Sequence, residues 1–470
     1  MDIINYFASR NIKGGGVYFQ AARQALYSKG IKTSYEPIPG EQHNIDVSSY
    51  DDINNTDHVN NNESKSEGIG KRIVFYLSSI AQADIMTQSA SGLVLERDTW
   101  KPLVIPPYSS VNAQANSSVD SYIIGGLYDI IPMLDGTMIH IYWFDGAWRI
   151  STSKSYDNTD VIFTNTTLTH KQLFDEVLQG CDLISMDEFT SHLDKECSYT
   201  LIIVHPDVHL YWKSREVRYH IHLVQRAHLP TFNRYYNWSN DSKDQNEYLT
   251  KIPIQKPVDL STHGIKKVNL AVLKKICDNK THILSSKTKT TTTPIVSEYS
   301  NELVNMFQFG VMLRSKDPIM TSKLSYLNMD STMLNHIKHM LYDHTMLSQM
   351  RPQFDRENFV ILHAYLSRYY HSVFLELLPQ YSATYTDISA RINSLIGHLI
   401  RYYTSEKTVK NGGQPLKITS KQPDVVLAIK TRIDEITDIN VDNTEECRKI
   451  LLSYLLDSNM TSMMYPYIFV

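Results

Sequence analysis

The sequence has few cysteines, and their spacing indicates no covalent or metal framework. The 470 residues include four cysteines, which lie far apart and form no C-x-x-C pair: Cys181, Cys197, Cys277 and Cys447. A disulfide scaffold or a structural zinc site is therefore not indicated. Reduced thiols in a cytosolic-type compartment are the better interpretation.

Long apolar runs and several common catalytic loops are absent as well. No run of about 18 apolar residues could form a membrane-spanning helix. The first residues, MDIINYFASRNIKGGG, lack the apolar segment of a signal peptide. The sequence contains no G-x-x-x-x-G-K-[ST] phosphate loop and no G-x-S-x-G nucleophile elbow. We therefore expect no membrane contact, no P-loop site and no serine-hydrolase site.

No charge of either sign dominates, but the charges are unevenly distributed. The 46 basic and 50 acidic residues give a net charge of −4, which excludes a wholly basic nucleic-acid coat. Residues 41–68 carry seven acids and one lysine, which predicts a disordered acidic insertion over 41–70. Residues 251–289 carry nine lysines and two acids. Such a segment is usually a solvated surface, but it can also line a groove that follows a phosphate backbone.

The hydrophobic pattern predicts an α+β protein with a helical end. Residues 1–40 predict a small N-terminal element. Residues 71–225 contain short β-branched and aromatic runs, an Asp145-Gly146 hairpin turn and the short helix HKQLFDEVLQG. From residue 328 apolar residues recur at helical spacing. We therefore predict a core with antiparallel sheets at 71–327 and an all-helical C-terminal domain at 328–470.

Several short motifs are each weak, but their order is informative. The segments are SGLVLERDTWKPLVIPPYSSVNA at 91–113, GGLYDIIPMLDGTMIHIYWFDGAWRISTSKSYD at 125–157, SYTLIIVHPDVHLYW at 198–212 and FGVMLRSKDP at 309–318. This order resembles the covalent nucleotidyltransferase superfamily, in particular the phage-type ATP-dependent RNA ligases. The W-x-x-S-T and V-H-P forms at 148–152 and 204–206 are similar to a diverged branch in large DNA viruses.

The resemblance implies an ATP-grasp-like nucleotidyltransferase core and a three-step chemistry. In the family, the lysine of a K-x-D-G motif attacks the α-phosphate of ATP and forms a lysine–AMP phosphoramide. Carboxylates of F-E and E-G motifs hold a divalent metal and the ribose, and further lysines neutralise phosphate charge. The nucleotide then passes to an RNA 5′-phosphate and is displaced by a 3′-OH. ATP and Mg²⁺ are thus the implied cofactors of an active protein, and RNA is its implied partner.

The departures from the family pattern fall on its catalytic residues. Alignment of Asp135-Gly136 on the D-G dipeptide puts Met133 at the nucleophilic lysine. Ser91 stands at the arginine of an R-G segment, and Ile202 and Phe309 stand at the glutamates of F-E and E-G. Because the nucleophile and both glutamates are replaced in one register, the resemblance favours a site that has lost its reaction.

Other residues keep a possible role in binding. The candidates for nucleotide binding, which remain from the family pattern, are Asp135, Gly136, Arg314, Lys316 and Lys323. A D-G dipeptide is also a common turn. Lys154 is the candidate for a relocated nucleophile, or else a solvent-facing lysine or a phosphate contact. The candidates for RNA binding are Lys266, Lys267, Lys274 and Lys275, with aromatic residues such as Tyr235 and Tyr236 upstream.

Histidines form the other cluster of candidate ligands. They are His205, His209, His220, His222 and His228, and no acid or cysteine completes a recognisable metal pattern around them. We therefore predict no metal site there, and core or surface histidines instead.

Three functions remain open from the sequence. The first is a catalytically degenerate RNA-ligase-like protein that binds RNA ends or nucleotide. The second is an active ATP-dependent RNA ligase with a relocated nucleophilic lysine. The third is a non-enzymatic viral structural or interaction protein whose helical domain binds a protein partner. All three predict a cytoplasmic location, in the host cytoplasm or, if viral, in the virion.

Overall fold

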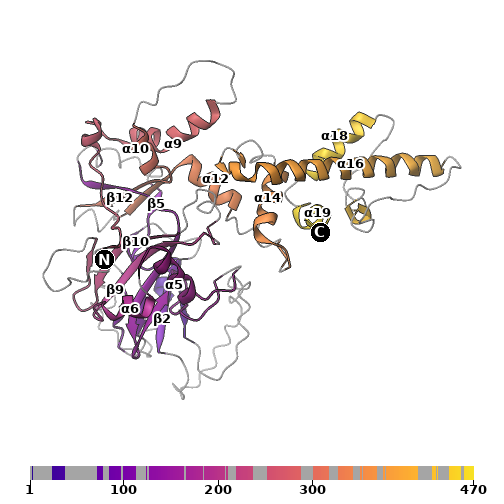
Figure 1. The fold of residues 1–470 in the computed structure, drawn as a ribbon. Coiled ribbons are helices and arrows are strands. Elements are labelled where there is room, and N and C mark those ends of the chain that lie inside the picture. Colours follow the sequence, from indigo (N-terminus) through magenta and orange to yellow (C-terminus); the bar gives the residue numbers. More distant parts are fainter. Residues whose placement is uncertain are drawn as a thin grey trace. The chain divides into compact units, whose positions relative to one another are not determined.

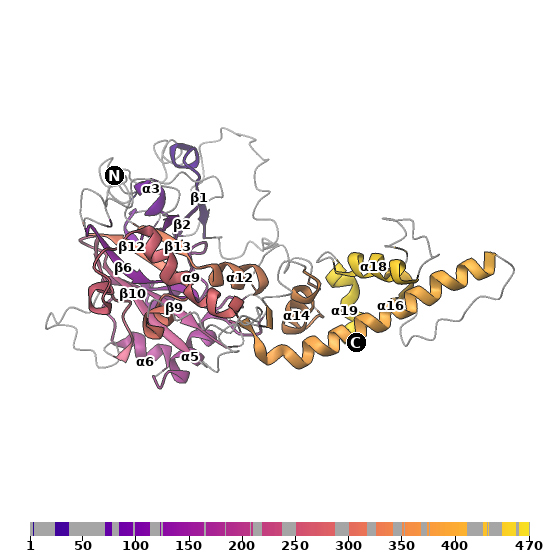
Figure 2. The same cartoon turned by 90° about the horizontal axis from the view of Figure 1, so that it is seen from above.

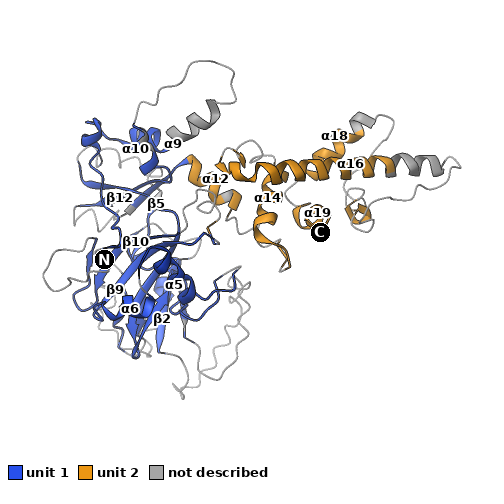
Figure 3. Ribbon diagram, in the orientation of Figure 1, with its two compact units in different colours: residues 1–208, 218–280, 294–331 blue, residues 209–217, 281–293, 332–470 orange. Residues whose placement is uncertain are grey.

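The computed structural model separates the chain into two compact units (Figure 3). Unit 1 comprises residues 1–208, 218–280 and 294–331, and unit 2 comprises 209–217, 281–293 and 332–470. The structure describes residues 3, 24–36, 71–77, 84–96, 99–112, 123, 126–163, 166–183, 185–206, 208–209, 219–236, 251–286, 300–316, 326–341, 350–351, 353–367, 374–375, 377–410, 426–429, 431, 444–456 and 460–469. The predicted acidic insertion at 41–70, most of the element at 1–40 and Lys323 lie outside these residues.

Unit 1 is built on three sheets, whose strands are mostly antiparallel (Figure 1). The first sheet has the order β1 (Ile31–Tyr35), β2 (Arg72–Leu77), β3 (Val94–Glu96) and β4 (Pro102–Val104). The second has the order β11 (Asn233–Tyr235), β10 (His220–His228), β9 (Cys197–Val204), β7 (Thr137–Phe144) and β8 (Ala147–Ser151). The third has the order β5 (Val111–Asn112), β13 (Tyr326–Asp330), β12 (Gly310–Ser315) and β6 (Tyr128–Pro132). The predicted mixture of helix and antiparallel sheet is confirmed, with the parallel pair β5–β13 as an exception.

The β7–β8 hairpin has the turn that the sequence predicted. Asp145 and Gly146 have φ values of 49° and 77°. Two positive φ angles match the twist of the flanking strands, and Asp-Gly tolerates them well. The tight turn puts Trp143 directly opposite Trp148 on the neighbouring strand.

Two helices cover one face of the second sheet (Figure 1). Helix α5 (His170–Gly180) begins with a capping box, in which Thr169 Oγ1 accepts from the Gln172 N–H and Gln172 Oε1 accepts from the Thr169 N–H. Helix α6 (Met186–Ser191) follows it. Their apolar side chains pack on those of β7 and β9, with a core that includes Leu173, Phe174, Val177, Phe189, Ile139, Ile141, Leu201 and Ile203. The predicted helix HKQLFDEVLQG is therefore confirmed over its full length.

Helix α9 (Leu270–Ser286) lies beside β12 and β13 of the third sheet (Figure 2). The core also includes the short helices η3 (Leu260–His263) and α10 (Asn301–Met306). Val311 and Leu313 of β12 face this core. Since side chains alternate along a strand, Met312 and Arg314 lie on the other face of the sheet.

Arg72 joins the first sheet to the second and is 6% exposed. Its Nε and Nη2 donate to Glu36 at 3.1 and 2.7 Å, and its Nη1 donates to Asp157 at 2.9 Å and to the Tyr142 hydroxyl at 3.0 Å. Tyr142 is fully buried and donates in turn to the Tyr156 carbonyl. The carboxylates and hydrogen bonds hold the pKa of Arg72 above its usual value, against the opposing effect of burial.

The short helix α3 (Ile85–Gln88) covers the first sheet near Ile73.

The secondary structure described for residues 332–469, in unit 2, is helical. The helices are α12 (Thr332–Leu341), α14 (Arg356–Leu366), η4 (Pro379–Tyr381), α16 (Ser382–Lys410), α18 (Thr444–Leu455) and α19 (Thr461–Phe469). Aromatic rings join α14 to α19, since Phe354 stacks on Tyr465 at 4.1 Å and the Tyr465 hydroxyl accepts from the Asp355 N–H. Among the described residues, no helix has both the length and the apolar character to cross a membrane.

Replacing Arg72 with Met should lower the free energy of unfolding by about 3–5 kcal/mol, because it leaves carboxylates facing one another without their buried counter-charge. Lys71→Met is the matched control. The Lys71 side chain is 64% exposed and 3.4 Å from Asp145, and exposed pairs of this kind contribute little. Denaturant unfolding of both variants measures the difference. Equal losses in the two variants would contradict a central role for Arg72.

Replacing Gly180 with Ala should destabilise the protein by about 1–3 kcal/mol, because a Cβ there would lie 1.9 Å from the Tyr219 ring. Gly397→Ala in α16 is the control, since its Cβ would meet nothing within 4 Å. That change should stabilise its helix by about 0.5–1 kcal/mol. Denaturant unfolding should show a lower free energy of unfolding for Gly180→Ala and a higher one for Gly397→Ala. An unchanged value for Gly180→Ala would show that Tyr219 moves aside freely.

Candidate functional site

The turn from Met133 to Gly136 connects the third sheet to the second. β6 ends at Pro132, which pairs with Val311 of β12, and the Met133 N–H donates to the Gly310 carbonyl at 3.1 Å. The next strand, β7, begins at Thr137 and pairs with β9. The position aligned with the nucleophilic lysine is therefore beside the residue that follows Phe309.

Gly136 lies directly against β9. Its φ is 147°, and a Cβ there would lie 2.7 Å from the Ile203 carbonyl oxygen and 2.8 Å from Ile202 Cγ2. A side chain at this position would collide with backbone, so the D-G glycine is required by close packing and not only by a turn. Ile202, which stands at the position of the F-E glutamate, is thus in contact with the turn that carries Met133.

These backbone contacts place Met133 beside Gly310 and Gly136 beside Ile202, at a junction between the second and third sheets. Phe309 directly precedes Gly310. Ile202 and Phe309 are buried, with 9% and 3% exposure. A thioether, an aliphatic chain and a phenyl ring offer neither an amine nor a carboxylate oxygen. The junction residues therefore do not fit a hard divalent cation.

The face of the second sheet next to this junction carries two rows of cross-strand neighbours. Met138, Ile202 and His222 form the first row. His140, Thr200 and Gln225 form the second, in which His140 Nδ1 lies 2.9 Å from Thr200 Oγ1.

Gly92 packs against the second of these rows. Its Cβ would lie 2.8 Å from His140 Nε2, and its φ is 87°. Ser91, at the position of the R-G arginine, directly precedes this glycine. The segment aligned with the R-G motif therefore lies on the same face of the second sheet.

Arg314 has local partners on the third sheet. Its Nε and Nη2 donate to Asp129 Oδ2 at 3.2 and 2.7 Å, and its guanidinium lies 4.2 Å from the Tyr236 ring centre. Lys316 is exposed and lies 3.9 Å from the same carboxylate. Their predicted role in nucleotide binding stays a prediction.

The remaining candidate lysines are dispersed. Lys154 is exposed in a turn after β8, where the Thr152 N–H donates to the Ser155 carbonyl. Lys266, Lys267 and Lys275 are exposed near or on α9, while Lys274 pairs with Asp278 at 3.0 Å.

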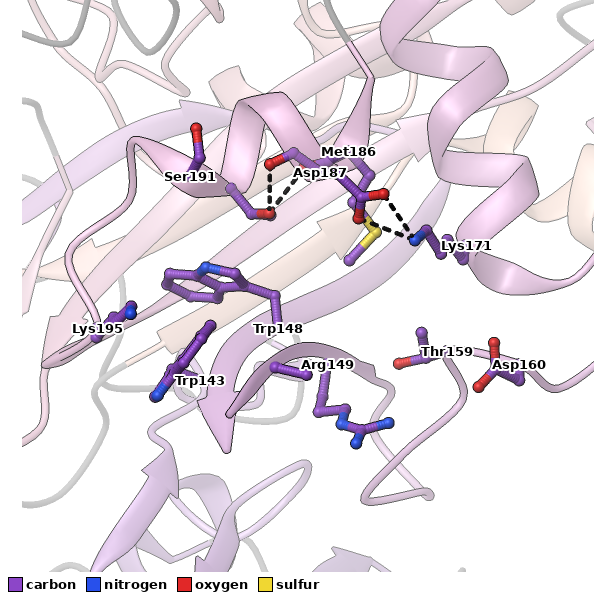
Figure 4. Close-up of a pocket in the computed structure, with 12 residues that line it drawn as sticks. Trp143, Trp148, Arg149, Thr159, Asp160, Lys171, Met186, Asp187, Ser191 and Lys195 are labelled. Carbon is purple, nitrogen blue, oxygen red and sulfur yellow. Dashed lines mark hydrogen bonds and ion pairs between the residues drawn. The ribbon is translucent and has the colours of Figure 1, made fainter. Parts of the chain in front are cut away.

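A pocket lies at the hairpin end of the second sheet, on the face covered by α5 and α6 (Figure 4). It has a volume of about 550 Å³ and is lined by Trp143, Trp148, Arg149, Lys171, Met186 and Lys195, among others. The sequence interpretation did not identify this site. The sequence does contain a sign of it: two tryptophans, Trp143 and Trp148, flank the Asp145-Gly146 turn, and Arg149 follows the second.

No protein-family profile matches the sequence, but curated proteins are similar to it. A protein of African swine fever virus (Malawi tick isolate) named "Putative RNA-ligase" is 24% identical over 333 residues, which are 67% of this chain and 68% of that protein. One of the same name from the Badajoz strain is 25% identical over 335 residues, with the same coverage of 67% and 68%. The resemblance to RNA ligases is confirmed.

Solved RNA ligases are more distant in structure. A lysine-to-methionine mutant of the Naegleria gruberi RNA ligase with AMP and Mn has a TM-score of 0.29 and 10% identity, and the match covers 50% of this chain and 58% of that one. An archaeal ATP-dependent RNA ligase has a TM-score of 0.33 and 8% identity, with coverage of 68% and 64%. Likenesses at these TM-scores do not support a comparison of individual residues.

The described histidines of the cluster at 205–228 lie against other protein groups. His205 is fully buried, its Nε2 lies 2.8 Å from Glu176, and its ring packs edge-on against Tyr219. The rings of His220 and His222 lie 4.7 Å apart. Within the described part of the chain, no three His, Cys, Asp or Glu residues are grouped so as to hold a metal ion.

Burial lowers the pKa of His140 to about 4, and burial with the neighbouring His220 lowers the pKa of His222 to about 4. The unfolded chain binds these protons first, near the usual value of 6.5. Above pH 6.5 these two histidines should therefore have no effect on the free energy of unfolding. Between pH 6.5 and 4 the free energy of unfolding should fall, by up to about 1.4 kcal/mol per pH unit for each histidine.

Equilibrium unfolding at several pH values measures this slope. His140→Gln and His222→Gln should each reduce it, and the double variant should reduce it further, whatever their effect at pH 7. A slope unchanged in the double variant would contradict the assignment of these two histidines.

Proposed function

We propose that this protein is a catalytically degenerate RNA-ligase-like protein, which binds nucleotide or RNA ends without forming a lysine adenylate. The observation that carries the proposal is the junction of Met133, Ile202 and Phe309. The Met133–Gly310 hydrogen bond and the Gly136–Ile203 contact support the proposal, because they bring two of the aligned segments together. Substitutions dispersed over the surface would carry no such weight.

The chemistry of these side chains explains the proposed loss. A phosphoramide needs an amine that attacks phosphorus and then loses its proton, and the thioether of Met133 cannot do this. Ile202 and Phe309 supply no oxygen ligand for the metal that balances the charge of a triphosphate. Restoring one residue would therefore leave the other two requirements unmet.

Non-covalent binding needs less than catalysis, and parts of the pattern suited to it remain. Asp135 and Gly136 keep the turn, while Lys316 presents an exposed ammonium on the third sheet. Lys266, Lys267 and Lys275 are exposed as well and could contact an RNA backbone. Lys323 is a further candidate by its place in the sequence.

The second candidate function is an active ATP-dependent RNA ligase with Lys154 as its nucleophile. In its favour, β8 runs antiparallel to β7, so the turn that holds Lys154 follows the β8 end that pairs with His140. The exposure of this lysine weakens the case, because an attacking amine gains from burial that lowers its pKa.

Incubation with ATP labelled at the α-phosphate and Mg²⁺ or Mn²⁺, followed by denaturing electrophoresis, should give no labelled protein. The Met133→Lys variant should also stay unlabelled, because the two carboxylates are still missing. ATP or an RNA with a 5′-phosphate should nevertheless raise the melting temperature.

Label in the natural chain that disappears in Lys154→Ala, but persists in the control Lys275→Ala, would establish the second candidate instead. Absence of both label and thermal shift would overturn nucleotide and RNA binding. It would favour an interaction protein that acts through its helices.

A further inference from the structure

The pocket at the end of the β7–β8 hairpin has an aromatic and apolar lining. The Trp143 and Trp148 rings meet edge to face, with centres 5.6 Å apart at 71°. Trp148 also packs on Tyr199 at 6.3 Å and on the apolar core beneath the helices. Met186 completes the lining (Figure 4). Rings held in this way form an apolar corner, against which a planar ligand can pack with little loss of side-chain entropy.

Cations at this pocket are incompletely balanced by carboxylates. The Lys195 ammonium lies 3.8 Å from the centre of the Trp143 ring, and no described carboxylate forms an ion pair with it. Arg149 lies 3.6 Å from Asp157, whose same oxygen accepts from Arg72 at 2.9 Å. Arg149 Nε is buried and has no hydrogen-bond partner among the described residues. Arg149 lies opposite Tyr142 in the hairpin, so its side chain leaves the other face of the sheet from Trp143, and Lys195 is the cation beside Trp143.

The opposite side of the pocket is acidic (Figure 4). Asp187 pairs with Lys171 at 2.9 Å, and Asp160 is an exposed carboxylate beside Thr159. Carboxylates accept hydrogen bonds from amino groups and repel phosphates. The pocket is therefore polarised, with the Lys195 cation near Trp143 and acceptors near Asp160.

We propose that this pocket binds a nucleotide, with the base packed against the tryptophans and the phosphate held by Lys195. The exocyclic amine of the base would then face Asp160 and Asp187. A pocket of about 550 Å³ lies within the range of small-ligand sites, about 300–1,000 Å³. The same chemistry is offered by a free mononucleotide and by the exposed terminal nucleotide of an RNA strand.

This site is separate from the junction at Met133. The strand β7 runs from Thr137, beside the junction, to Trp143, beside the pocket. Six residues of strand span about 20 Å. The pocket is also on the face of the second sheet that α5 and α6 cover, whereas Met138 and Ile202 are on the other face. The proposal extends nucleotide or RNA-end binding to a second surface and does not rest on the loss of the adenylation reaction.

Fluorescence titration of the full chain with AMP, and separately with single-stranded oligoadenylate, tests the proposal at low salt. Trp143→Leu and Lys195→Gln should each weaken binding about tenfold, through the loss of one base–aromatic stack or one phosphate contact. Lys449→Gln, an exposed lysine on α18, is the control and should bind like the natural chain. Thermal unfolding checks the folding of Trp143→Leu and of Lys195→Gln, which also loses its contact with the Trp143 ring.

The two ligands identify the source of the nucleotide. Binding of AMP with the expected losses supports a mononucleotide site, and binding of the oligonucleotide alone supports a strand end. No binding of either ligand, or equal affinity in all variants, would overturn the proposal. The labelling experiment with ATP tests the loss of adenylation at Met133, and this titration tests the pocket. Either proposal can therefore fail without the other.

Discussion

The buried guanidinium of Arg72 is the interaction on which the arrangement of unit 1 depends. It connects the segment after β1, strand β2, strand β7 and the loop at Asp157 through charged hydrogen bonds. A buried cation of this kind is costly unless every donor finds an acceptor, and here Glu36, Asp157 and Tyr142 supply them. The geometry of these donors fixes how the first sheet meets the second.

The same ion pair also affects the pocket. Asp157 lies closer to Arg72 than to Arg149, at 2.9 and 3.6 Å from the respective nitrogens. Arg149 therefore shares its nearest carboxylate and keeps a buried donor without a partner. The Arg149 side chain thus lies toward the boundary between the first and second sheets, and Lys195 is the cation beside Trp143.

Strand β7 carries residues of both proposed sites, the junction at Met133 and the pocket at Trp143. Its first residues follow the D-G turn, where the alignment puts apolar residues at the family's catalytic positions, and its last residues carry the aromatic wall of the pocket. Because neighbouring side chains of a strand face opposite ways, Met138 and His140 belong to one site and Trp143 to the other. The two proposed sites therefore lie on opposite faces of the same strand, and a substitution at one leaves the side chains of the other in place.

Local patterns in the sequence determined the elements that depend on neighbouring residues. The Asp145-Gly146 turn, the α5 capping box and the order of the ligase-like motifs could all be predicted, because turn angles and helix caps involve residues a few positions apart. The replacement of the lysine by Met133 was also visible without a structure. Only the tertiary structure decided that Met133 lies beside Gly310 and Gly136 beside Ile202, since contacts between residues this far apart in the chain depend on strand pairing. It also decided that Arg314 pairs with Asp129 and that two tryptophans, an arginine and a lysine share one pocket, because burial and charge compensation arise from packing and cannot be read from spacing.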